Sequence, residues 1–479
     1  MKPIIIGLDI GTTKLGAVAI DAERGTLLAV ESIPNAGHVA AGPDGAEQDA
    51  RVVIAGALEL LATLLARPEV QGGQVCGLGV SGQMHGVVVV DDACVPLTHL
   101  ISWQDGRGAH PFGSSGRSYT EEVVYRLGDH APGRTGCEPA TGYGAVTLFR
   151  LQQQGLLPAR GTALTIHDAM VMTLCGRALT DPTGAASWGI FDGVSGGWLA
   201  DVDTMFPGLS PLLPAIAPIG SRAGVLAPAV AARTGLPAGI PVAVALGDNQ
   251  ASFLGSVPSP AASVLINLGT GGQMSTSIER FVYQAPLETR PFVDGRWLMV
   301  GASLCGGRAY QVLESFYRKI AHDLFDLPLT DSLYQRMNAL AEQASDDCGG
   351  LAVSTLFEGS RLHPAQRGTI SGISARNLTP ANLTSAVSHG MADELLGFFA
   401  IARQAGARPT TLCGAGNGVR HNPIVRRQLT QQLGLPLTLP AHPEEAAVGA
   451  ALSGGVAAGV FANWEEATRR VFAGSEEIV

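Results

Sequence analysis

Two aspartates each stand at the end of an apolar run, where a carboxylate can face a cleft. Asp9 follows residues 4–8 and comes just before a glycine–threonine turn, whereas Asp248 follows the apolar residues 242–246. Such a carboxylate can hold Mg²⁺ together with phosphate oxygens and water, or accept a proton from a hydroxyl group. We expect Asp9 to be a metal ligand, and Asp248 to be both the general base and a metal ligand. The alternative for Asp248 is that it caps the helix that follows.

Two similar turns rich in glycine and threonine lie more than half the chain apart. Residues 11–13 (Gly-Thr-Thr) and residues 269–271 (Gly-Thr-Gly) each follow an apolar run and precede a second strand-like run. Successive backbone N–H groups in such turns form an anion-binding concavity, and threonine hydroxyls add donors. Either turn alone is more often an ordinary hairpin. The repetition predicts a duplicated unit with two facing turns that clamp a polyphosphate.

A third glycine-rich stretch, residues 412–418, could let a flat base lie against the backbone, or could equally be a loop at the start of a helix.

A competing motif is Gly77-x-Gly79-x-x-Gly82, which has the spacing of a dinucleotide fingerprint. That fingerprint needs a preceding strand and a helix that opens at its last glycine. Here the glycines lie within a strand-like run, and residues 83–86 lead into the apolar residues 87–90. This context is hairpin-like, so dinucleotide binding is not expected.

Several short polar clusters suit the recognition of a polyhydroxylated compound. Residues 103–107 (Trp-Gln-Asp-Gly-Arg) combine an apolar platform with hydrogen-bonding groups and a cation. Residues 47–49 (Glu-Gln-Asp) precede a helical pattern, where helix capping is the alternative. His85 could bond a hydroxyl group, and His167 beside Asp168 could be an oriented imidazole, although an isolated buried histidine is more often structural.

The elements that must position these residues alternate between strand-like and helix-like runs. Residues 75–80, 86–90 and 242–246 are strand-like, and residues 50–66 carry apolar side chains at helical spacing. The alternation predicts an α/β fold, and 479 residues exceed a single hydrophobic core. We place the domain boundary near Gly247, giving an N-terminal domain over 1–246 and a C-terminal domain over 247–479.

Residues 446–462 carry no charge but are rich in alanine and glycine, which predicts a buried helix pair with close backbone contacts, not a membrane span.

The composition narrows the classes of function. The net charge is −10 with no cluster of basic residues, so neither nucleic acid nor a membrane surface is expected as a partner. Lysine occurs only at Lys2, Lys14 and Lys319, so no Gly-Lys pair of a P-loop exists. Seven scattered cysteines, none at CxxC spacing, predict reduced thiols in a cytoplasmic protein.

Taken together, these segments resemble the FGGY carbohydrate kinases, a branch of the actin/hexokinase-like superfamily. The similarity covers nearly the whole chain. It lies in residues 9–13 (DIGTT), 79–86 (GVSGQMHG), 103–107 (WQDGR), 245–252 (ALGDNQAS), 267–272 (NLGTGG), 301–310 (GASLCGGRAY), 413–418 (CGAGNG) and 444–451 (EEAAVGAA). These motifs follow one another in the order of the family.

The resemblance implies two ribonuclease-H-like domains around a catalytic cleft, with a small-molecule sugar and MgATP as the partners. Asp248 would accept the proton of a ketose hydroxyl that attacks the γ-phosphate, with Asp9 and Asp248 near Mg²⁺. The residues expected to bind ATP are Gly11, Thr12, Thr13, Gly269, Thr270, Gly271, Gly307, Gly414, Gly416 and Asn417. The residues expected to bind the sugar are Gln48, Asp49, Gln83, Met84, His85, Trp103, Asp105, His167, Asp168 and Asn249.

Within the family, residues 41–49, 101–107, 140–144, 165–168 and 185–189 resemble the sedoheptulokinase branch, and the xylulokinase branch is the alternative. Members often carry a basic residue three positions after the second threonine, where this chain has Gly16, so the role of Lys14 stays open. The rival of another class is an actin-like nucleotide switch without a sugar substrate. The residues do not fix the oligomeric state, and a homodimer stays open.

Overall fold

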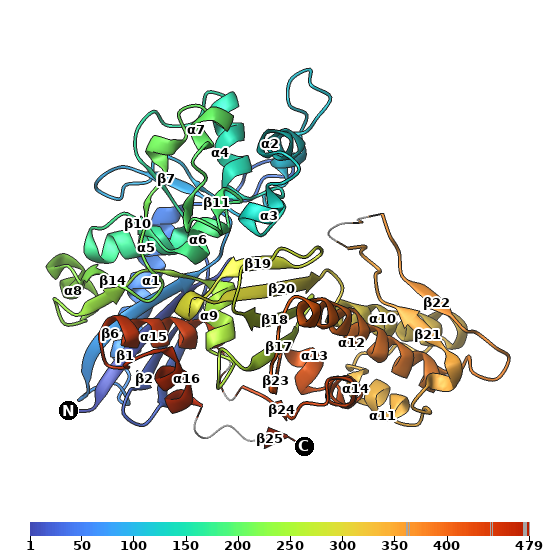
Figure 1. Ribbon diagram of the computed structural model, residues 1–479. Coiled ribbons are helices and arrows are strands. Elements are labelled where there is room, and N and C mark those ends of the chain that lie inside the picture. Colours follow the sequence, from blue (N-terminus) through green and yellow to red (C-terminus); the bar gives the residue numbers. More distant parts are fainter. Residues whose placement is uncertain (361–362, 364, 441, 443, 473–476, 479) are drawn as a thin grey trace.

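The computed structural model describes residues 1–360, 363, 365–440, 442, 444–472 and 477–478. The chain folds into two lobes, each built around a seven-stranded mixed sheet (Figure 1). The first sheet has the order β14 (Arg222–Val225), β15 (Pro241–Ala243), β6 (Gln74–Gly82), β1 (Pro3–Ile10), β2 (Lys14–Asp21) and β3 (Thr26–Pro34), with β16 (Leu246–Gly247) beside β6. The second has the order β19 (Glu288–Pro291), β20 (Trp297–Ser303), β18 (Gly272–Ile278), β17 (Ser263–Leu268), β23 (Thr411–Ala415), β24 (Leu437–Thr438) and β25 (Glu477–Ile478).

The predicted duplication is visible in the strand pairing. β1 and β2 form an antiparallel hairpin around residues 11–13, and β1 runs parallel to β6. In the same way, β17 and β18 form an antiparallel hairpin around residues 269–271, and β17 runs parallel to β23. Each glycine–threonine turn therefore stands at the carboxyl end of the first strand of its sheet, as the sequence predicts.

Helix α1 (Ala50–Leu65) confirms the helical pattern at residues 50–66 and packs against β2 and β3. Longer helices of the second lobe are α10 (Gly307–Phe325) and α12 (Pro380–Gln404). Further helices are α2 (Tyr119–Leu127), α3 (Pro132–Thr135), α4 (Gly144–Gln153), α5 (Ile166–Cys175), α6 (Pro182–Ala186), α7 (Val202–Met205), α8 (Pro228–Thr234), α9 (Asp248–Leu254), α11 (Tyr334–Ala341), α13 (Asn417–Arg420), α14 (Pro423–Leu433), α15 (Glu445–Ala457) and α16 (Trp464–Val471). Short strands form five small sheets. One has three strands, β4 (His38–Val39), β5 (Glu47–Gln48) and β8 (Leu100–Ile101). The others are pairs: β7 (Val88–Val90) with β9 (Thr162–Leu164); β10 (Leu179–Thr180) with β13 (Ala215–Ile216); β11 (Phe191–Asp192) with β12 (Gly197–Trp198); and β21 (Ala352–Ser354) with β22 (Thr369–Ser371).

The uncharged stretch near the C-terminus returns to the first sheet. It forms one helix, α15, instead of the expected pair, and α15 lies against β1, β6 and α9 (Figure 1). A Cβ atom added to Gly7 would stand 1.9 Å from the carbonyl oxygen of Ala447, and one added to Gly79 would stand 1.8 Å from that of Ala450. Glycine is therefore required on the strands, and the predicted close backbone contacts are present.

The Gly77-x-Gly79-x-x-Gly82 spacing is explained by the same packing. All three glycines lie in β6, and the backbone of α15 occupies the space beside Gly77 and Gly79. The expected hairpin context is wrong, because β7 pairs with β9 and not with β6. No helix opens at Gly82, so the motif serves helix–sheet packing and not a dinucleotide.

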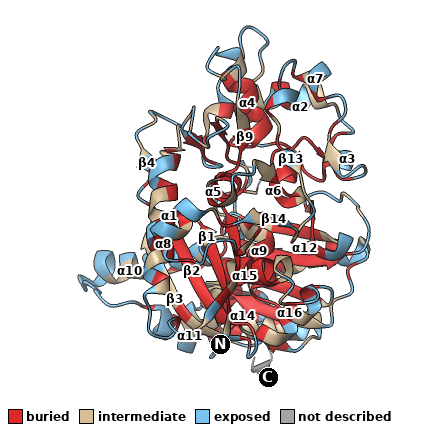
Figure 2. Ribbon diagram, turned by 90° about the vertical axis from the view of Figure 1, so that its left-hand side faces the viewer, coloured by how far each residue is buried: buried red, intermediate tan, exposed pale blue. Residues whose placement is uncertain are grey.

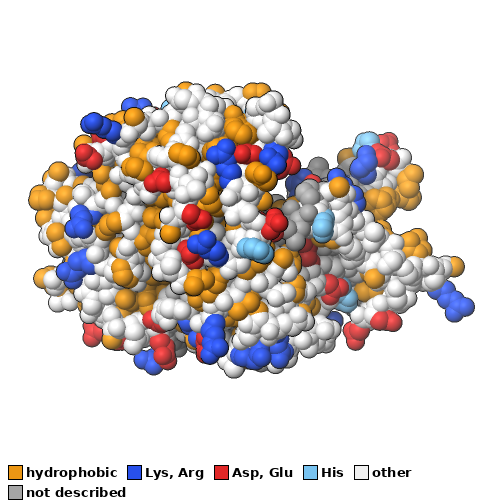
Figure 3. All heavy atoms as spheres, turned by 45° about the horizontal axis from the view of Figure 1, so that its top comes forward, with side chains coloured by type: hydrophobic (Ala, Val, Ile, Leu, Met, Phe, Trp, Pro, Cys, Tyr) orange, Lys and Arg blue, Asp and Glu red, His pale blue; other side chains and the backbone are white. Residues whose placement is uncertain are grey.

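Burial follows the two sheets and the helices packed against them, with α5 and α15 among the most buried (Figure 2). Basic and acidic side chains are interspersed over the face drawn in Figure 3. Among the described residues, no helix is long and apolar enough to cross a membrane.

Candidate active site

The two aspartates singled out from the sequence lie at the junction of the lobes. Asp9 stands near the end of β1, where the hydroxyl of Ser81 donates to its carboxylate at 2.8 Å. Asp248 is the first residue of α9; the N-cap is Gly247, so the capping alternative for Asp248 is not realised. Burial raises the pKa of Asp9 to about 6. Burial, followed by the charge of Asp9, raises the pKa of Asp248 to about 7, while Arg290 acts in the opposite direction.

The charge of Asp9 raises the pKa of Asp248, and the charge of Glu444 raises the pKa of Asp9, so the site gathers negative charge that a bound cation relieves. Among the described residues, no group of three or more His, Cys, Asp or Glu side chains could enclose a metal ion. Mg²⁺ fits such a sparse site, since it is usually held by one or two carboxylates together with substrate phosphates and water. Asp9 and Asp248 are the residues that would hold it.

The first glycine–threonine turn is tied to three of the expected sugar-binding residues. The hydroxyl of Thr12 donates to Gln83 at 3.1 Å and accepts from the indole N–H of Trp103 at 2.9 Å. Its carbonyl accepts from Gln48 at 3.1 Å, and Gln83 donates to Gln48 at 3.0 Å. Gln48 and Gln83 are buried, whereas Trp103 is 46% exposed. The turn and the aromatic platform are thus built as one unit.

Lys14, whose role the sequence leaves open, follows this turn. Its ammonium group contacts the carboxylate of Glu444 at 2.6 Å. A Cβ atom on Gly16 would stand 2.9 Å from the same carboxylate, so the glycine leaves room for Glu444. Lys14 is therefore engaged in an ion pair between segments distant in sequence.

The second glycine–threonine turn borders a cavity of about 900 Å³. The turn is fixed to the start of α10, where Gly307 donates to the carbonyl of Gly269 at 2.8 Å and Arg308 to that of Thr270 at 3.0 Å. Of the residues expected to bind ATP, those that line the cavity are Gly269, Thr270, Gly307, Gly416 and Asn417. Glu445 also lines it, and the neighbouring Glu444 forms the ion pair with Lys14, which follows the first turn.

Two aromatic residues of this cavity were not found from the sequence. Tyr310 and Tyr334 stack with ring centroids 5.8 Å apart, and the phenol of Tyr310 donates to Asn338 at 2.8 Å. Gly414 lies in β23, where an added Cβ would meet Val419 and Leu437 in the core. The cavity thus offers aromatic faces and an amide to a planar base, while Gly414 supports the strand beneath it.

His85 has a strained backbone conformation and is held by Ser187. Its backbone φ is +70°, which a residue with a side chain adopts only when the surroundings hold it there. Its amide donates to the hydroxyl of Ser187 at 3.0 Å, and its Nδ1 lies 2.7 Å from the Ser187 carbonyl. Because a carbonyl only accepts, Nδ1 carries the proton and Nε2 is an acceptor. Met84 packs against Gly247, where a Cβ would stand 2.8 Å from its sulfur.

Three further residues beside His85 were missed by the sequence analysis. Arg290 of β19 reaches across from the second lobe, 3.4 Å from Nε2 of His85. Arg290 also donates from Nε to Glu288 at 2.9 Å, and the phenol of Tyr143 donates to Glu288 at 2.9 Å. The ring of Tyr143 stacks on His85 with centroids 4.1 Å apart. This cluster is charged, Tyr143 and Arg290 in it are buried, and it lies where the sugar is expected.

Two of the predicted sugar-binding carboxylates already have partners. Asp49 caps α1 by accepting from the amide of Arg51 at 2.9 Å, and it also pairs with the guanidinium of Arg51. Asp105 is buried, accepts from the amide of Ala46 at 3.0 Å and pairs with Arg107. The geometry favours a supporting role for both, which for Asp49 is the capping alternative.

His167 and Asp168 lie on α5, fully buried. Burial lowers the pKa of His167 to about 3 and raises that of Asp168 to about 8, so both are neutral near pH 7. Asp168 accepts from the hydroxyl of Thr165 at 2.7 Å. With no exposed surface, neither side chain can touch a ligand in this structure.

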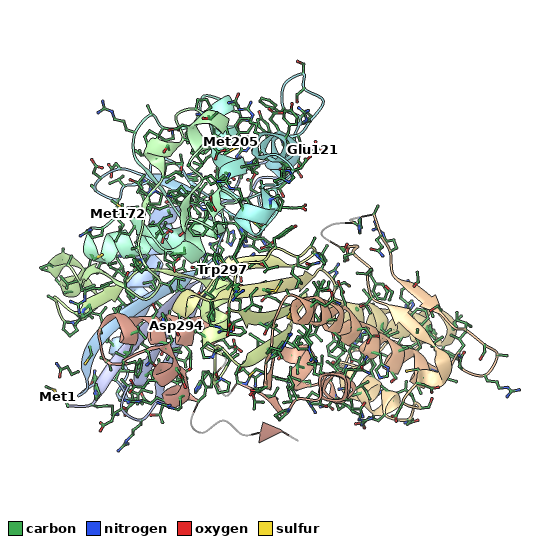
Figure 4. The ribbon with its side chains drawn as sticks, viewed as in Figure 1. Met1, Glu121, Met172, Met205, Asp294 and Trp297 are labelled. Carbon is green, nitrogen blue, oxygen red and sulfur yellow. The ribbon has the colours of Figure 1, made fainter. Side chains whose placement is uncertain are left out.

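Asn249, the residue after Asp248, joins the lobes. Its amide donates to Gln273 of β18 at 3.0 Å, and its side-chain oxygen is buried with no hydrogen-bond partner in the part of the chain that the structure describes. Trp297 of β20 lies at the same junction (Figure 4), packed beside Ala185 and Phe191 of the first lobe. The candidate base is thus surrounded by contacts from both lobes.

Comparison with known proteins gives a consistent result. Residues 4–255 match the N-terminal domain, and residues 264–458 the C-terminal domain, of the FGGY family of carbohydrate kinases. The chain is 30% identical to sedoheptulokinase from Homo sapiens, over 94% of this chain and 97% of that protein. It is 24% identical to xylulose kinase from Haemophilus influenzae, over 80% of this chain and 76% of that protein.

Among solved structures, the crystal structure of xylulose kinase from Rhodospirillum rubrum matches with a TM-score of 0.86 and 24% identity, over 99% of this chain and 94% of that one. Glycerol kinase from Plasmodium falciparum with ADP matches with a TM-score of 0.79 and 17% identity, over 98% of this chain and 93% of that one. At these identities the likeness concerns the fold. The predicted two-domain α/β fold of the actin/hexokinase type is confirmed.

Proposed function

Because the chain belongs to the FGGY family of carbohydrate kinases, we propose that this sugar kinase phosphorylates a terminal primary hydroxyl of a ketose, with sedoheptulose as substrate and sedoheptulose 7-phosphate as product. The observation that carries the proposal is the pair Asp9 and Asp248 at the lobe junction, between a sugar-facing cluster and a nucleotide-sized cavity. ATP is the phosphoryl donor that the family uses.

In the proposed reaction, Asp248 accepts the proton of the ketose hydroxyl. The hydroxyl oxygen forms a bond to the γ-phosphorus as the bond between that phosphorus and the β,γ-bridging oxygen breaks, and ADP leaves. A Mg²⁺ ion held by Asp9 and Asp248 would neutralise charge on the phosphate oxygens. The pKa of Asp248, raised to about 7, suits a group that must both accept and release a proton near neutral pH.

The protein groups around Asp248 have separate tasks in this proposal. The N–H groups of residues 11–13 and 269–271 bind the phosphates, and the stacked tyrosines Tyr310 and Tyr334 border the place of the base. Trp103 offers an exposed apolar face to the carbon chain of the sugar, while His85 and Arg290 offer polar groups to its hydroxyls.

Support for a seven-carbon ketose comes from the 30% identity with sedoheptulokinase along nearly the full length of both chains, compared with 24% for the xylulose kinase. D-xylulose is the alternative substrate. An actin-like nucleotide switch is the alternative of another class, and it predicts ATP hydrolysis that does not respond to sugar.

A coupled ADP-release assay over a panel of ketoses and polyols tests the proposal. We expect sedoheptulose to give the highest kcat/KM, with release of ADP matched by formation of the sugar phosphate. A higher kcat/KM for D-xylulose would move the assignment to the alternative substrate, and ADP release indifferent to every sugar would favour the switch. Asp248→Asn tests the base: turnover should be lost while ATP binding is retained.

A further inference from the structure

A five-residue helix, α6, lies buried directly behind the candidate base. Its N-cap is Asp181, whose carboxylate accepts from the amide of Gly184 at 2.9 Å, and Pro182 occupies the first turn. Thr183 and Asp181 are 0% and 1% exposed, so neither can touch a substrate. A polar threonine at such a depth needs partners for its hydroxyl.

Thr183 finds both partners, and one of them is the residue that precedes the base. Its hydroxyl donates to Oδ1 of Asp181 at 2.6 Å and accepts from the amide N–H of Gly247 at 2.8 Å. Donation to the carboxyl group fixes the rotation of the hydroxyl, so its lone pair faces Gly247. Gly247 is the N-cap of α9 and is followed directly by Asp248. The direction in which Asp248 enters the cleft is therefore set from α6.

The other end of α6 holds the acceptor side of the site. Ser187 is the C-cap of α6; its hydroxyl donates to the carbonyl of Gly184 at 2.6 Å and accepts from the amide of His85. The carbonyl of Ser187 also accepts from Nδ1 of His85. A single short helix thus anchors His85 at one end and Gly247 at the other, and it fixes the spacing between them.

We propose that Thr183 is a positioning residue of the phosphoryl transfer, whose hydroxyl holds Gly247 and thereby aims Asp248 at the acceptor hydroxyl. The proposal rests on the proposed role of Asp248 as the base. A displacement of about 1 Å in a reacting group lowers turnover by about 100-fold, so loss of this one bond has a measurable effect. Substrate affinity should change little, because Thr183 touches neither substrate.

The test compares Thr183→Ser with Thr183→Ala, because these two variants differ from each other only by the hydroxyl. We expect Thr183→Ala to lower kcat by about 100-fold with little change in KM for ATP, and Thr183→Ser to keep most of the wild-type kcat. Thr183→Val, which retains the shape of threonine, should behave like the alanine variant. Equal kcat for the serine and alanine variants would overturn the proposal.

Thr234→Val is the matched control for a loss of stability alone. Thr234, the last residue of α8, is also buried; its hydroxyl donates to the carbonyl of Val230 at 2.9 Å and accepts from the amide of Leu236 at 3.3 Å. This variant should lower Tm but leave kcat unchanged. If Thr183→Val lowers Tm and kcat no more than Thr234→Val does, Thr183 is merely structural.

Crystal structures of the variants test the position of Asp248 directly, and this test does not depend on which sugar is the substrate. In crystals of Thr183→Ala, the first turn of α9 and the carboxylate of Asp248 should move relative to Thr183→Ser. An unmoved Asp248 would refute the positioning role even if no sugar were a substrate. Conversely, an inactive Asp248→Asn with an unaffected Thr183→Ala would leave the base assignment intact and reject the positioning role.

Discussion

The phenol of Tyr143 donates a hydrogen bond of 2.9 Å to Glu288, and this bond joins the two lobes beside the acceptor site. Glu288 in turn holds Arg290, which reaches Nε2 of His85, and His85 stacks on Tyr143. The four side chains form a closed ring with two members from each lobe. The proposed sugar site therefore combines residues of both lobes.

Arg290→Met should impair use of the sugar. The change takes the guanidinium away from the half-buried Glu288 and removes the positive charge that opposes the rise in the pKa of Asp248. A hydrogen bond to a charged group contributes about 1.5–3 kcal/mol, so loss of the contact that Arg290 is proposed to make with the sugar should lower kcat/KM for the sugar about 10- to 100-fold. Steady-state kinetics in which the sugar and ATP concentrations are varied separately measures kcat/KM for each substrate.

Arg134→Met is the control for this prediction. Arg134 also pairs with a carboxylate, Asp192 at 2.8 Å, but its side chain is 44% exposed. Because the guanidinium is open to water and the pair lies outside the ring around His85, this variant should keep its activity. If the two arginine variants lose kcat/KM equally, the ring around His85 has no special part in the reaction.

Tyr334→Ala should weaken nucleotide binding. Tyr334 stacks on Tyr310 at the edge of the cavity and is 39% exposed, so its ring can face a bound base. Loss of one stacking partner costs about 0.5–1.5 kcal/mol, so KM for ATP should rise several-fold while KM for the sugar stays constant. Tyr125→Ala, at an exposed tyrosine of α2, provides the comparison and should leave both KM values unchanged.

The sequence was sufficient for features that depend on local patterns. Both glycine–threonine hairpins and the helix at residues 50–66 follow from turn chemistry and apolar spacing, and these formed as predicted. The motif at residues 245–252 drew attention to Asp248 for similar reasons, although its catalytic role stays a prediction.

The missed residues depend on contacts between distant segments. Tyr143, Glu288 and Arg290 belong to elements about 145 residues apart that meet only after the lobes pack. One signal was present: Glu288 and Arg290 are two apart in a strand, so their side chains share one face. The burial of His167 and Asp168 could not be predicted from the sequence either, because their neighbours in the chain are compatible with a place in the interior and with a place at the cleft.

Asp168→Asn should change how stability depends on pH. Burial raises the pKa of Asp168 from 3.8 to about 8, so the folded protein keeps a proton that the unfolded chain releases near pH 4. The contribution of Asp168 to the free energy of unfolding is therefore full below about pH 4 and is lost as the pH rises toward about 8. An amide has no such titration, so the Tm of the variant relative to wild type should increase between about pH 5 and about pH 9.

Thermal unfolding followed by circular dichroism at a series of pH values measures this difference. Asp92→Asn, at an exposed aspartate, is the control for the change from aspartate to asparagine itself. A Tm difference for Asp168→Asn that is flat or falls with rising pH would contradict a neutral buried carboxyl at this position.

Gly449→Ala should disturb the base through helix packing. A Cβ atom on Gly449 of α15 would stand 1.9 Å from the carbonyl oxygen of Ala251, which lies in the same short helix as Asp248. Backbone cannot give way as a flexible side chain can, so α9 must shift, at a cost of about 1–3 kcal/mol in the free energy of unfolding. We expect a lower midpoint in urea and a lower kcat for the protein that remains folded.

Gly397→Ala separates this effect from the general effect of alanine in a helix. Gly397 lies in α12, and an added Cβ would meet nothing within 4 Å, so alanine should stabilise the helix by about 0.5–1 kcal/mol. Opposite signs for the two substitutions in urea unfolding, with kcat reduced only in Gly449→Ala, would tie the contact between α9 and α15 to the placement of Asp248. If Gly449→Ala unfolds more easily but keeps the wild-type kcat, the contact stabilises the fold without governing the base.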